Sequence, residues 1–361
     1  MDDMVNPDGY GFYKGKRVLV TGDTGFKGSW LALWLLELGA EVAGFALPPQ
    51  YENDHYNLLD LVRLMKHING DIRDPQQFMN VCREFKPEIL FHLAAQPIVR
   101  FSYNEPKLTF DTNVGGSVNI LEAARSTPSL RAMVYVTSDK CYKNKDWVWG
   151  YRENDELGGH DPYSASKAAA EMVFSSYLDS FFHAMTGFGA ASVRAGNVIG
   201  GGDCSQDRII PDCIKALRNH QPIVVRNPLA TRPWQHVLEP LSGYLLTAIK
   251  LYQDPKAYSG AWNFGPDDHS IRTVHDLVNK VISIWGKGEL NIVSQKGAPH
   301  EARLLQLNCD KAKQLLHWRP CWNFDQAVEK TVSWYRQVEA GDSALRISKQ
   351  HITEYMEAID D

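Results

Sequence analysis

The sequence feature that most constrains the fold is a turn near the start of the chain with a glycine at every third position. Gly22, Gly25 and Gly28 follow the apolar run 17–21 and precede the apolar run 29–38. The short run predicts a buried parallel strand, and the longer run predicts a helix. Glycines between a strand and a helix let backbone N–H groups and the helix N-terminus approach a pyrophosphate. The turn therefore indicates a dinucleotide site, and a tight turn without a ligand is the alternative.

The rest of the N-terminal half alternates between strand and helix patterns. Strands are predicted at 41–46, 89–93, 132–137 and 190–194, and helices at 75–85, 107–127 and 163–184. This order is typical of an α/β fold with a doubly wound parallel sheet, the Rossmann fold, in which ligands bind beyond the carboxyl ends of the strands.

After about Gly196 the pattern is less regular. Helices are predicted at 211–219, 239–252, 273–285 and 324–338, between loops rich in proline and glycine. We therefore predict a dinucleotide-binding domain at 1–195 and a smaller C-terminal α/β substrate-binding lobe at 196–361, with segments that interleave. The segments 1–15 and 342–361 are predicted to be arms that fray or pack on a partner.

Composition excludes several classes of function. A net charge of −5 in 361 residues gives no electrostatic footprint for nucleic acid or for an anionic membrane surface. The six cysteines show no metal-ligand spacing, and we recognise neither a signal peptide nor an apolar stretch that could span a membrane. The expectation is a cytoplasmic protein with reduced thiols, no metal, no nucleic-acid partner and no membrane partner.

The dinucleotide site departs from the usual pattern at two places. The acid that binds the adenine ribose is expected about 20 residues after the turn, yet 44–50 contains none, and it contains no arginine for a 2′-phosphate either. NAD is therefore favoured over NADP, and Asp71 is the residue predicted to reach the adenine edge. Asp23 also puts a carboxylate inside the turn, which is unfavourable beside a pyrophosphate. We predict a loosely held cofactor.

Two further segments predict chemistry. Tyr163 and Lys167 are four residues apart and share one face of a helix, where an ammonium near a phenol favours the phenolate and hence a base. Ser138 and Asp139 follow a predicted strand, where the hydroxyl can bind a substrate oxygen and the acid can protonate a departing hydroxyl. Lys140 could orient Asp139 or assist proton removal. A surface Tyr–Lys pair and a Ser-Asp helix cap are the alternatives, but together the segments predict hydride transfer followed by loss of water.

These motifs resemble the extended short-chain dehydrogenase/reductase family that acts on nucleotide sugars, over about residues 15–340. The resemblance also rests on the segments His92–Gln96, Thr112–Val114, Arg194–Asp203 and Arg232–Val237. Within the family, Trp149–Glu153 is similar to the CDP-type sugar 4,6-dehydratases.

Two residues bear on that subgroup. The dTDP- and GDP-type dehydratases carry Thr-Asp-Glu, with the glutamate as the base at sugar C5, where this chain has Ser138-Asp139-Lys140. The CDP-type enzymes typically carry Ser-Asp-Lys, which leaves the C5 base open between Lys140 and Tyr163 acting indirectly. Most CDP-type turns have a histidine where this chain has Asp23.

The resemblance implies dehydration of CDP-glucose to CDP-4-dehydro-6-deoxyglucose with a recycled NAD, a step in deoxysugar biosynthesis for O-antigen lipopolysaccharide. The implied catalytic residues are Ser138, Asp139, Lys140, Tyr163 and Lys167. The implied NAD-binding residues are Gly22, Thr24, Gly25, Phe26, Lys27, Gly28, Asp71, Ile72, Leu93, Ala94, Ala95, Gln96, Asn113, Tyr163 and Lys167. The implied substrate-binding residues are Asn197, Arg208 and Arg232.

Three points stay open at this stage. Trp147 and Trp149 could cover the sugar or simply pack their loop. Likeness to relatives implies a homodimer or homotetramer through the helices 107–127 and 163–184. A C4 epimerase of nucleotide sugars and a non-catalytic dinucleotide-binding regulator are the competing functions.

Overall fold

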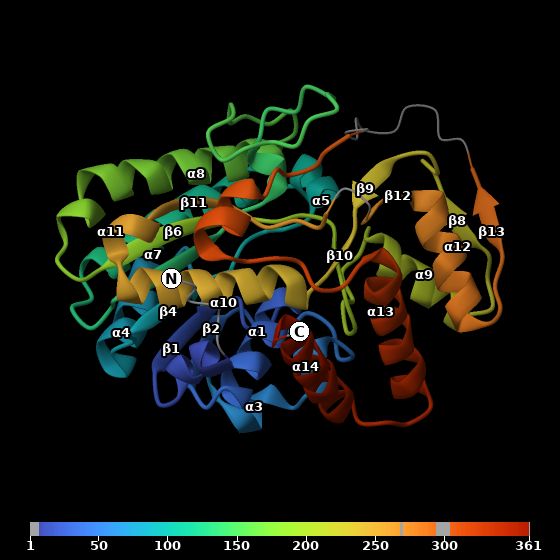
Figure 1. Ribbon diagram of the computed structural model, residues 1–361, viewed down its shortest axis with the longest axis horizontal. Helices are drawn as coiled ribbons and strands as arrows, with labels where there is room; N and C mark the ends of the chain where they lie inside the picture. The colour runs from blue at the N-terminus through green and yellow to red at the C-terminus, as the bar shows by residue number, and fades with distance from the viewer. Residues whose placement is uncertain (1–6, 268–269, 294–303, 361) are drawn as a thin grey trace.

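The protein is described by a computed structural model, which covers residues 7–267, 270–293 and 304–360. Seven parallel strands form one sheet in the order β11-β6-β5-β4-β1-β2-β3 (Figure 1). These strands are β1 (Arg17–Thr21), β2 (Glu41–Ala46), β3 (Lys66–Asn69), β4 (Ile89–His92), β5 (Ala132–Val136), β6 (Gly189–Arg194) and β11 (Gly260–Asn263). The predicted doubly wound parallel sheet is confirmed, although the sequence patterns missed β3 and β11.

Helices cover both faces of the sheet because side chains alternate along each strand. Leu19 belongs to the core under α4, α7 and α8, whereas Val18 and Val20 belong to the core under α1 and α10. The helices of this part are η1 (Pro7–Tyr13), α1 (Phe26–Glu37), α2 (His55–Leu58), α3 (Leu61–Leu64), α4 (Pro75–Phe85), α5 (Val99–Asn104), α6 (Pro106–Phe110), the π-helix η2 (Asp111–Gly116), α7 (Ser117–Arg125), η3 (Asp139–Cys141), α8 (Pro162–Ser180), η4 (Phe182–Ala184), α10 (Leu238–Gln253) and α11 (Pro255–Tyr258).

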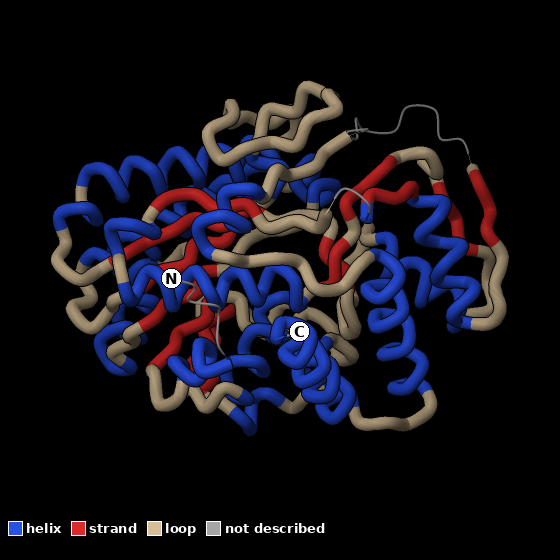
Figure 2. The backbone as a smooth tube through the Cα atoms, in the orientation of Figure 1, coloured by secondary structure: helices blue, strands red, loops and turns tan. Residues whose placement is uncertain are grey.

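The remaining elements come from the second half of the chain, and most of them lie at the right of Figure 2. They are β7 (Val198–Ile199), α9 (Ile209–Arg218), β8 (Ile223–Val225), β9 (Thr231–Pro233), β10 (Gln235–His236), β12 (Ile271–Thr273), α12 (Val274–Trp285), β13 (Leu290–Ile292), the π-helix η6 (Ala312–Leu316), α13 (Phe324–Glu339) and α14 (Ala344–Asp360). The division at residue 195 stays a prediction, and β11 and α10 show how the two parts interleave, because both pack on the sheet.

The prediction that the chain ends are arms is wrong for the described residues. Tyr13 in η1 is buried and donates a hydrogen bond to the carbonyl of Leu245 over 2.7 Å. At the other end, α14 packs on α1 and α13 and buries Ile347, Ile352 and Tyr355. The apolar positions of 344–360 give this segment one buried face, so it docks on its own chain. Residues 1–6 and 361 lie outside the described residues.

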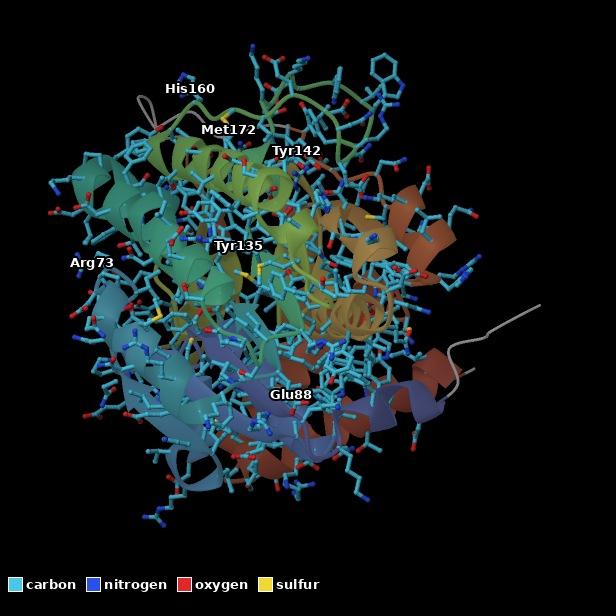
Figure 3. The ribbon with its side chains drawn as sticks, turned by 90° about the vertical axis from the view of Figure 1, so that its left-hand side faces the viewer. Arg73, Glu88, Tyr135, Tyr142, His160 and Met172 are labelled. Carbon is cyan, nitrogen blue, oxygen red and sulfur yellow. The ribbon has the colours of Figure 1, made fainter. Side chains whose placement is uncertain are left out.

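Helix α8 has two different faces (Figure 3). Phe174 is buried against the sheet, whereas Met172 and Phe181 expose 57% and 41% of their surface. Tyr135 on the neighbouring strand β5 stacks on Phe174 with ring centroids 5.2 Å apart. The buried face fixes the helix against the strands that carry the site, and the exposed face is mostly polar, with Met172 as its apolar exception.

Candidate active site

The glycine turn fits a pyrophosphate because side chains are sterically excluded from it. Gly22 has a φ of 76°, and a Cβ there would lie 2.7 Å from the backbone nitrogen of Ala94. A Cβ on Gly28 would lie 2.0 Å from the carbonyl oxygen of Gly22. The turn thus packs tightly on itself and on the loop after β4, and it leaves backbone N–H groups at the start of α1 available to an anion.

The carboxylate of Asp23 is directed under the turn, toward β2 and β3. Its Oδ2 lies 2.6 Å from Nδ1 of His67, and a Cβ on Gly44 would lie 2.1 Å from the same oxygen. Asp23 is fully buried. Burial raises the pKa of Asp23, and although burial alone would lower the pKa of His67, the bond to Asp23 raises it, so the carboxyl is paired with the imidazole and not with the ligand space. The prediction that the Asp23 carboxylate repels the pyrophosphate is therefore wrong. The absence of an acid for the adenine ribose is the remaining reason to expect weak binding of the cofactor.

The loop after β4 lies beside the turn and is held by two side chains. The backbone nitrogens of Leu93 and Ala94 both donate to Oγ1 of Thr21 over 3.2 Å. Asn113 accepts a bond from the Gln96 nitrogen and donates to the Gln96 carbonyl, at 2.8 and 3.0 Å. The Asn113 side chain thus fixes the backbone of the predicted cofactor loop. Direct contacts between this loop, including Ala95, and the cofactor stay predictions.

The other predicted cofactor residues lie around the same edge. Thr24 donates to the carbonyl of Leu47 over 2.9 Å, which ties the turn to the end of β2. Asp71 forms an ion pair with Arg73, whose guanidinium lowers the pKa of that carboxyl. Ile72 is buried beneath Gly116. The adenine role of Asp71 stays a prediction, with a carboxylate that is already paired.

Ser138 and Asp139 begin a short helix directly after β5. The Ser138 hydroxyl donates to Oδ1 of Asp139 over 2.9 Å and accepts the backbone N–H of Lys140 over 3.2 Å. The alternative of a helix cap is therefore also real at Ser138. Asp139 is buried against Gly196, where a Cβ would lie 1.9 Å from Oδ2, and Asn197 Nδ2 donates to that oxygen over 3.4 Å. The carboxyl is held in place by its surroundings on both oxygens.

Tyr163 and Lys167 lie in the first turns of α8, whose start is fixed by Asp161 as N-cap and Pro162 at the first position. Burial raises the pKa of Tyr163 to about 12, Asp139 adds to that rise, and a hydrogen bond to Ser138 opposes it. Burial lowers the pKa of Lys167 to about 8. The lowered phenol pKa expected from the sequence is thus not a property of the protein alone, because desolvation of the phenolate outweighs the hydrogen bond to Ser138 and the charge of Arg208.

Lys27 extends from the glycine turn toward the catalytic residues. Its ammonium lies 6.0 Å from the ring centroid of Tyr244 on α10. Burial lowers the pKa of Lys27 to about 7, the cations Arg208 and Lys167 lower it further, and Asp139 opposes them. Three basic side chains and one acid thus lie close to one another, which favours an anionic ligand in the space between them.

The predicted substrate residues come from the second half of the chain. Arg208 donates to Asp203 over 3.1 Å, and Asn197 adopts a left-handed backbone with a φ of 52° that turns its amide toward Asp139. Arg232 lies on β9 and donates to the Thr231 carbonyl over 2.8 Å. The structure thus brings Asn197 and Arg208 to the catalytic residues, and the role of Arg232 stays a prediction.

The tryptophan loop is packed by Trp147, and the role of covering the sugar stays a prediction. Trp149 is 68% exposed, whereas the ring of Trp147 lies 5.2 Å from that of Tyr151 and packs the loop. Trp147 and Val148 also line a cavity of about 120 Å³, whose other residues are Thr231, Pro233, Ile271, Leu304, Leu305 and Gln306.

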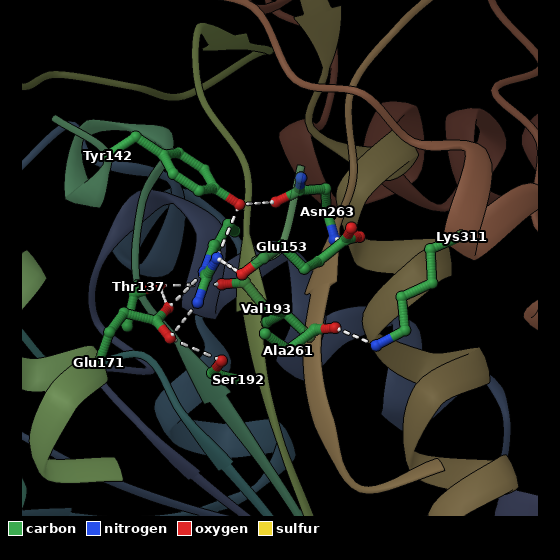
Figure 4. Close-up of polar contacts among 10 residues, drawn as sticks. Thr137, Tyr142, Glu153, Glu171, Ser192, Val193, Ala261, Asn263 and Lys311 are labelled. Atoms are coloured by element: carbon green, nitrogen blue, oxygen red, sulfur yellow. Dashed lines mark hydrogen bonds and ion pairs between the residues drawn. The ribbon is translucent and has the colours of Figure 1, made fainter. Parts of the chain in front are cut away.

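Sequence reasoning missed a buried polar network beneath the catalytic residues (Figure 4). Glu171 and Arg194 form a two-point ion pair, with Nε–Oε1 at 2.9 Å and Nη2–Oε2 at 2.7 Å. Burial lowers the pKa of His92 on β4, which bonds to Thr21 over 2.7 Å, and the nearby Lys167 lowers it further. The signal for Glu171 was its place four residues after Lys167 and eight after Tyr163, on one face of α8.

Comparisons with known proteins identify relatives of this chain in sequence and in fold. The CDP-glucose 4,6-dehydratase of Salmonella typhimurium is 48% identical over 351 residues, which cover 96% of this chain and 98% of that protein. The dTDP-glucose 4,6-dehydratase DesIV of Streptomyces venezuelae, solved with NAD and TYD bound, shares the fold with a TM-score of 0.77 at 24% identity, covering 91% of this chain and 99% of that one. The UDP-glucose 4-epimerase of Thermus thermophilus, solved with NAD, gives 0.76 at 25% identity, covering 89% and 99%.

Within the described residues, no helix is long and apolar enough to cross a membrane.

The family model for GDP-mannose 4,6-dehydratase matches residues 19–331. The predicted resemblance to nucleotide-sugar dehydratases is therefore confirmed, and this chain belongs to the GDP-mannose 4,6-dehydratase family.

Proposed function

We propose that this protein is a hydro-lyase that converts CDP-glucose into CDP-4-dehydro-6-deoxyglucose and water with a recycled NAD. The observation that carries the proposal is the acid Asp139, buried beside Ser138 and close to the base Tyr163. A dehydrogenase needs the base alone, whereas loss of water also needs a proton for the departing hydroxyl. The choice of CDP as the nucleotide is supported by the 48% identical relative.

The residues divide the chemistry as follows. Tyr163 takes the proton of the sugar 4-hydroxyl, and the ketone formed at C4 then acidifies the hydrogen at C5. Asp139 gives its proton to the 6-hydroxyl, which leaves as water, while Lys140 takes the C5 proton and later returns it. The proton that Tyr163 took then replaces the one lost by Asp139, so both residues are restored. The C4 carbon loses a hydride and C6 gains one, so the substrate undergoes no net oxidation. Ser138 holds the reacting 4-oxygen through its hydroxyl.

The glycine turn and the loop after β4 would hold the cofactor. The fit rests on Gly22 and Gly28, where a Cβ would meet backbone atoms at 2.7 and 2.0 Å, so the turn is shaped for close approach of a phosphate. NAD, when bound, accepts the hydride from C4 and returns it to C6. Lys167 lies one helical turn from Tyr163, and its ammonium favours the phenolate once the site is occupied.

We propose that the substrate diphosphate binds between the two parts of the chain. Arg208 carries a positive charge that Asp203 holds in place over 3.1 Å, and Lys27 adds a second cation near it. Bidentate recognition by a held guanidinium is well suited to a diphosphate. Arg232 is a third candidate.

We also propose that two copies of the chain pair through α6, α7 and α8, and that the protein is cytoplasmic. The support for pairing is three exposed apolar side chains, Phe110 at the end of α6, Met172 on α8 and Phe181 directly after α8, which expose 38%, 57% and 41% of their surface. Surfaces of this kind mark contact sites between proteins. Mass measurement in solution distinguishes a monomer from a dimer or tetramer.

The competing functions predict different products. A C4 epimerase needs no acid at C6, and its product has the mass of the substrate, whereas a binding protein turns over nothing. The test is incubation with NAD and, separately, the glucose esters of CDP, dTDP, GDP and UDP. We expect a product lighter by one water from the CDP sugar, with the alkaline absorbance of a 4-keto-6-deoxy sugar. Unchanged mass or no reaction with all four would refute the proposal.

A further inference from the structure

Helix α8 carries three ionisable side chains along one face at intervals of four residues. Tyr163 and Lys167 form the predicted catalytic pair, and Glu171 follows one turn later. All three are buried, with 6%, 6% and 2% of their surface exposed. Since the carboxylate of Glu171 does not reach the site itself, its burial needs another explanation.

Every polar partner of Glu171 comes from a strand that ends at the site. Arg194 on β6 forms the two-point ion pair, and Ser192 on the same strand donates to Oε2 over 2.8 Å. Thr137, the residue directly before Ser138, donates to Oε1. The network therefore connects the catalytic helix to the end of β5, where the catalytic Ser-Asp pair begins.

Arg194 extends the network to the segment after Asp139. Its Nη1 donates to the hydroxyl of Tyr142 over 2.7 Å and to the carbonyl of Glu153 over 3.0 Å. Tyr142 donates in turn to Oδ1 of Asn263 on β11 over 2.8 Å, as Figure 4 shows. Tyr142 stands two residues after Lys140, so both ends of the Ser138–Lys140 segment are tied to one ion pair.

Glu171 also supplies charge. Burial lowers the pKa of Lys167, and Glu171 is the largest of the influences that oppose this, followed by Cys141 in η3. The other groups around Lys167 are His92 on β4, Lys27 on α1 and Tyr163 on its own helix. For Glu171 itself, burial would raise the pKa, but Arg194 and the three hydroxyl and guanidinium bonds lower it, so the carboxylate stays ionised.

We propose that Glu171 is a positioning residue of this site, which fixes catalytic helix α8 and the Ser138–Lys140 segment through Arg194 and presents a negative charge to Lys167. The inference rests on the proposed function only for the kinetic part of its test. The charge part concerns Lys167 alone and is measured without substrate or cofactor.

Two variants separate charge from geometry. Glu171→Gln keeps the shape and removes the charge, whereas Glu171→Asp keeps the charge and shortens the side chain. The probe is the NMR titration of the lysine side chains, with the Lys167 signal assigned from Lys167→Met. We expect Glu171→Gln to lower the Lys167 midpoint by about one pH unit or more, and Glu171→Asp to leave it within about 0.3 unit.

The kinetic part asks whether placement matters. Both variants should lower kcat about 10-fold or more with KM for the nucleotide sugar changed less than about threefold, because substrate contacts are intact while the catalytic groups shift. If Glu171→Gln does not fold, the variant Glu171→Gln/Arg194→Gln removes both charges and carries the same expectation for Lys167.

The matched control is Glu239→Gln. Glu239 is also fully buried and accepts bonds from the backbone nitrogens of Cys321 and Trp322, but it anchors the C-terminal segments. It should leave the Lys167 midpoint and kcat unchanged. An unshifted Lys167 in Glu171→Gln overturns the charge role, and an unchanged kcat in both Glu171 variants overturns the positioning role. Absence of turnover by the wild type counts against the proposed function and leaves the titration readable.

Discussion

Two buried polar regions hold two helices of this protein in different ways. Under α8 the partners are charged, and the guanidinium of Arg194 and the carboxylate of Glu171 satisfy each other. Under α14 most buried partners are neutral, and the exception is Glu239, which accepts a hydrogen bond from Tyr355 over 2.8 Å. His55 stacks on Trp30 with ring centroids 4.4 Å apart, and Ser348 lies 3.0 Å from His55 Nε2 and 2.9 Å from Trp334 Nε1.

The comparison shows that this protein buries an ion pair beside its proposed catalytic groups, where burial of charge has a use. An ion pair has to be desolvated, so it stabilises a protein little more than an apolar contact of the same size. It does fix direction and supply an electric field, and both are useful beside catalytic groups. The region under α14 needs attachment alone, and neutral histidines between aromatic rings provide it while they stay unprotonated.

The largest effect is expected when the proposed base on α8, Tyr163, is replaced. Tyr163→Phe should lower kcat about 10³-fold, in the range of general base catalysis, with little loss of stability because only a hydroxyl is removed. Steady-state kinetics and urea unfolding measure the two effects. Tyr177→Phe on the same helix, which loses a bond to Glu122, is the control and should keep wild-type kcat. Equal activity in the two variants would contradict the assignment of Tyr163.

The second prediction concerns the acid. Asp139→Asn should lower product formation about 10²-fold, because an amide cannot donate a proton to the departing 6-hydroxyl. Oxidation at C4 does not need that proton. Mass spectrometry of quenched reactions should therefore find a 4-keto nucleotide sugar that keeps its C6 oxygen. If the variant forms dehydrated product at the wild-type rate, Asp139 is not the acid.

The third prediction is that low pH destabilises the region under α14, because its buried histidines become protonated. Burial lowers the pKa of His55 to about 3 and that of His351 to about 4, and it lowers the pKa of His236 as well. The unfolded chain binds these protons near pH 6.5, so the stability from neutral histidines is complete above that pH and is lost as the pH falls below it. Each histidine adds about 1.4 kcal/mol per pH unit to the slope between about pH 6 and 5.

Urea unfolding at several pH values measures that slope. His351→Phe should make it shallower by about 1.4 kcal/mol per pH unit. His220→Asn changes an exposed histidine and should leave the slope as it is. A slope unaffected by His351→Phe would show that α14 is not held by neutral histidine.

The region that carries the chemistry was the more predictable from sequence. The glycine turn, the Ser-Asp-Lys segment and the Tyr-Lys pair each follow a strand or open a helix, and parallel strands bring such positions to one edge. Local spacing thus determined the elements and the principal chemical groups. It could not give the pKa of Tyr163, because burial depends on residues far along the chain.

The residues that escaped prediction depend on long-range pairing. Glu171 pairs with Arg194, which lies 23 residues further along the chain. Asp23 pairs with His67 on β3, which lies 44 residues further along. α14 docks on α1 from the other end of the chain. Such contacts are set by the sheet order, which strand patterns alone do not specify.

The smallest effect concerns cofactor affinity. If the absent ribose acid weakens NAD binding, Ala46→Asp, at the last residue of β2, should tighten it about tenfold through one charge-assisted hydrogen bond. Asp23→Asn should change affinity less than about threefold, because His67 already occupies that carboxylate. Isothermal titration with NAD measures both. A submicromolar dissociation constant of NAD from the wild-type protein would contradict the prediction of a loosely held cofactor.

The most direct test of the central claim follows one hydrogen atom. CDP-glucose deuterated at C4 is incubated with the protein and NAD, and the product is examined by NMR and mass spectrometry. The proposed reaction predicts loss of one water and deuterium in the new methyl group at C6, since the hydride removed from C4 is returned there. Deuterium retained at C4 of a product with unchanged mass would contradict the account and establish epimerisation instead.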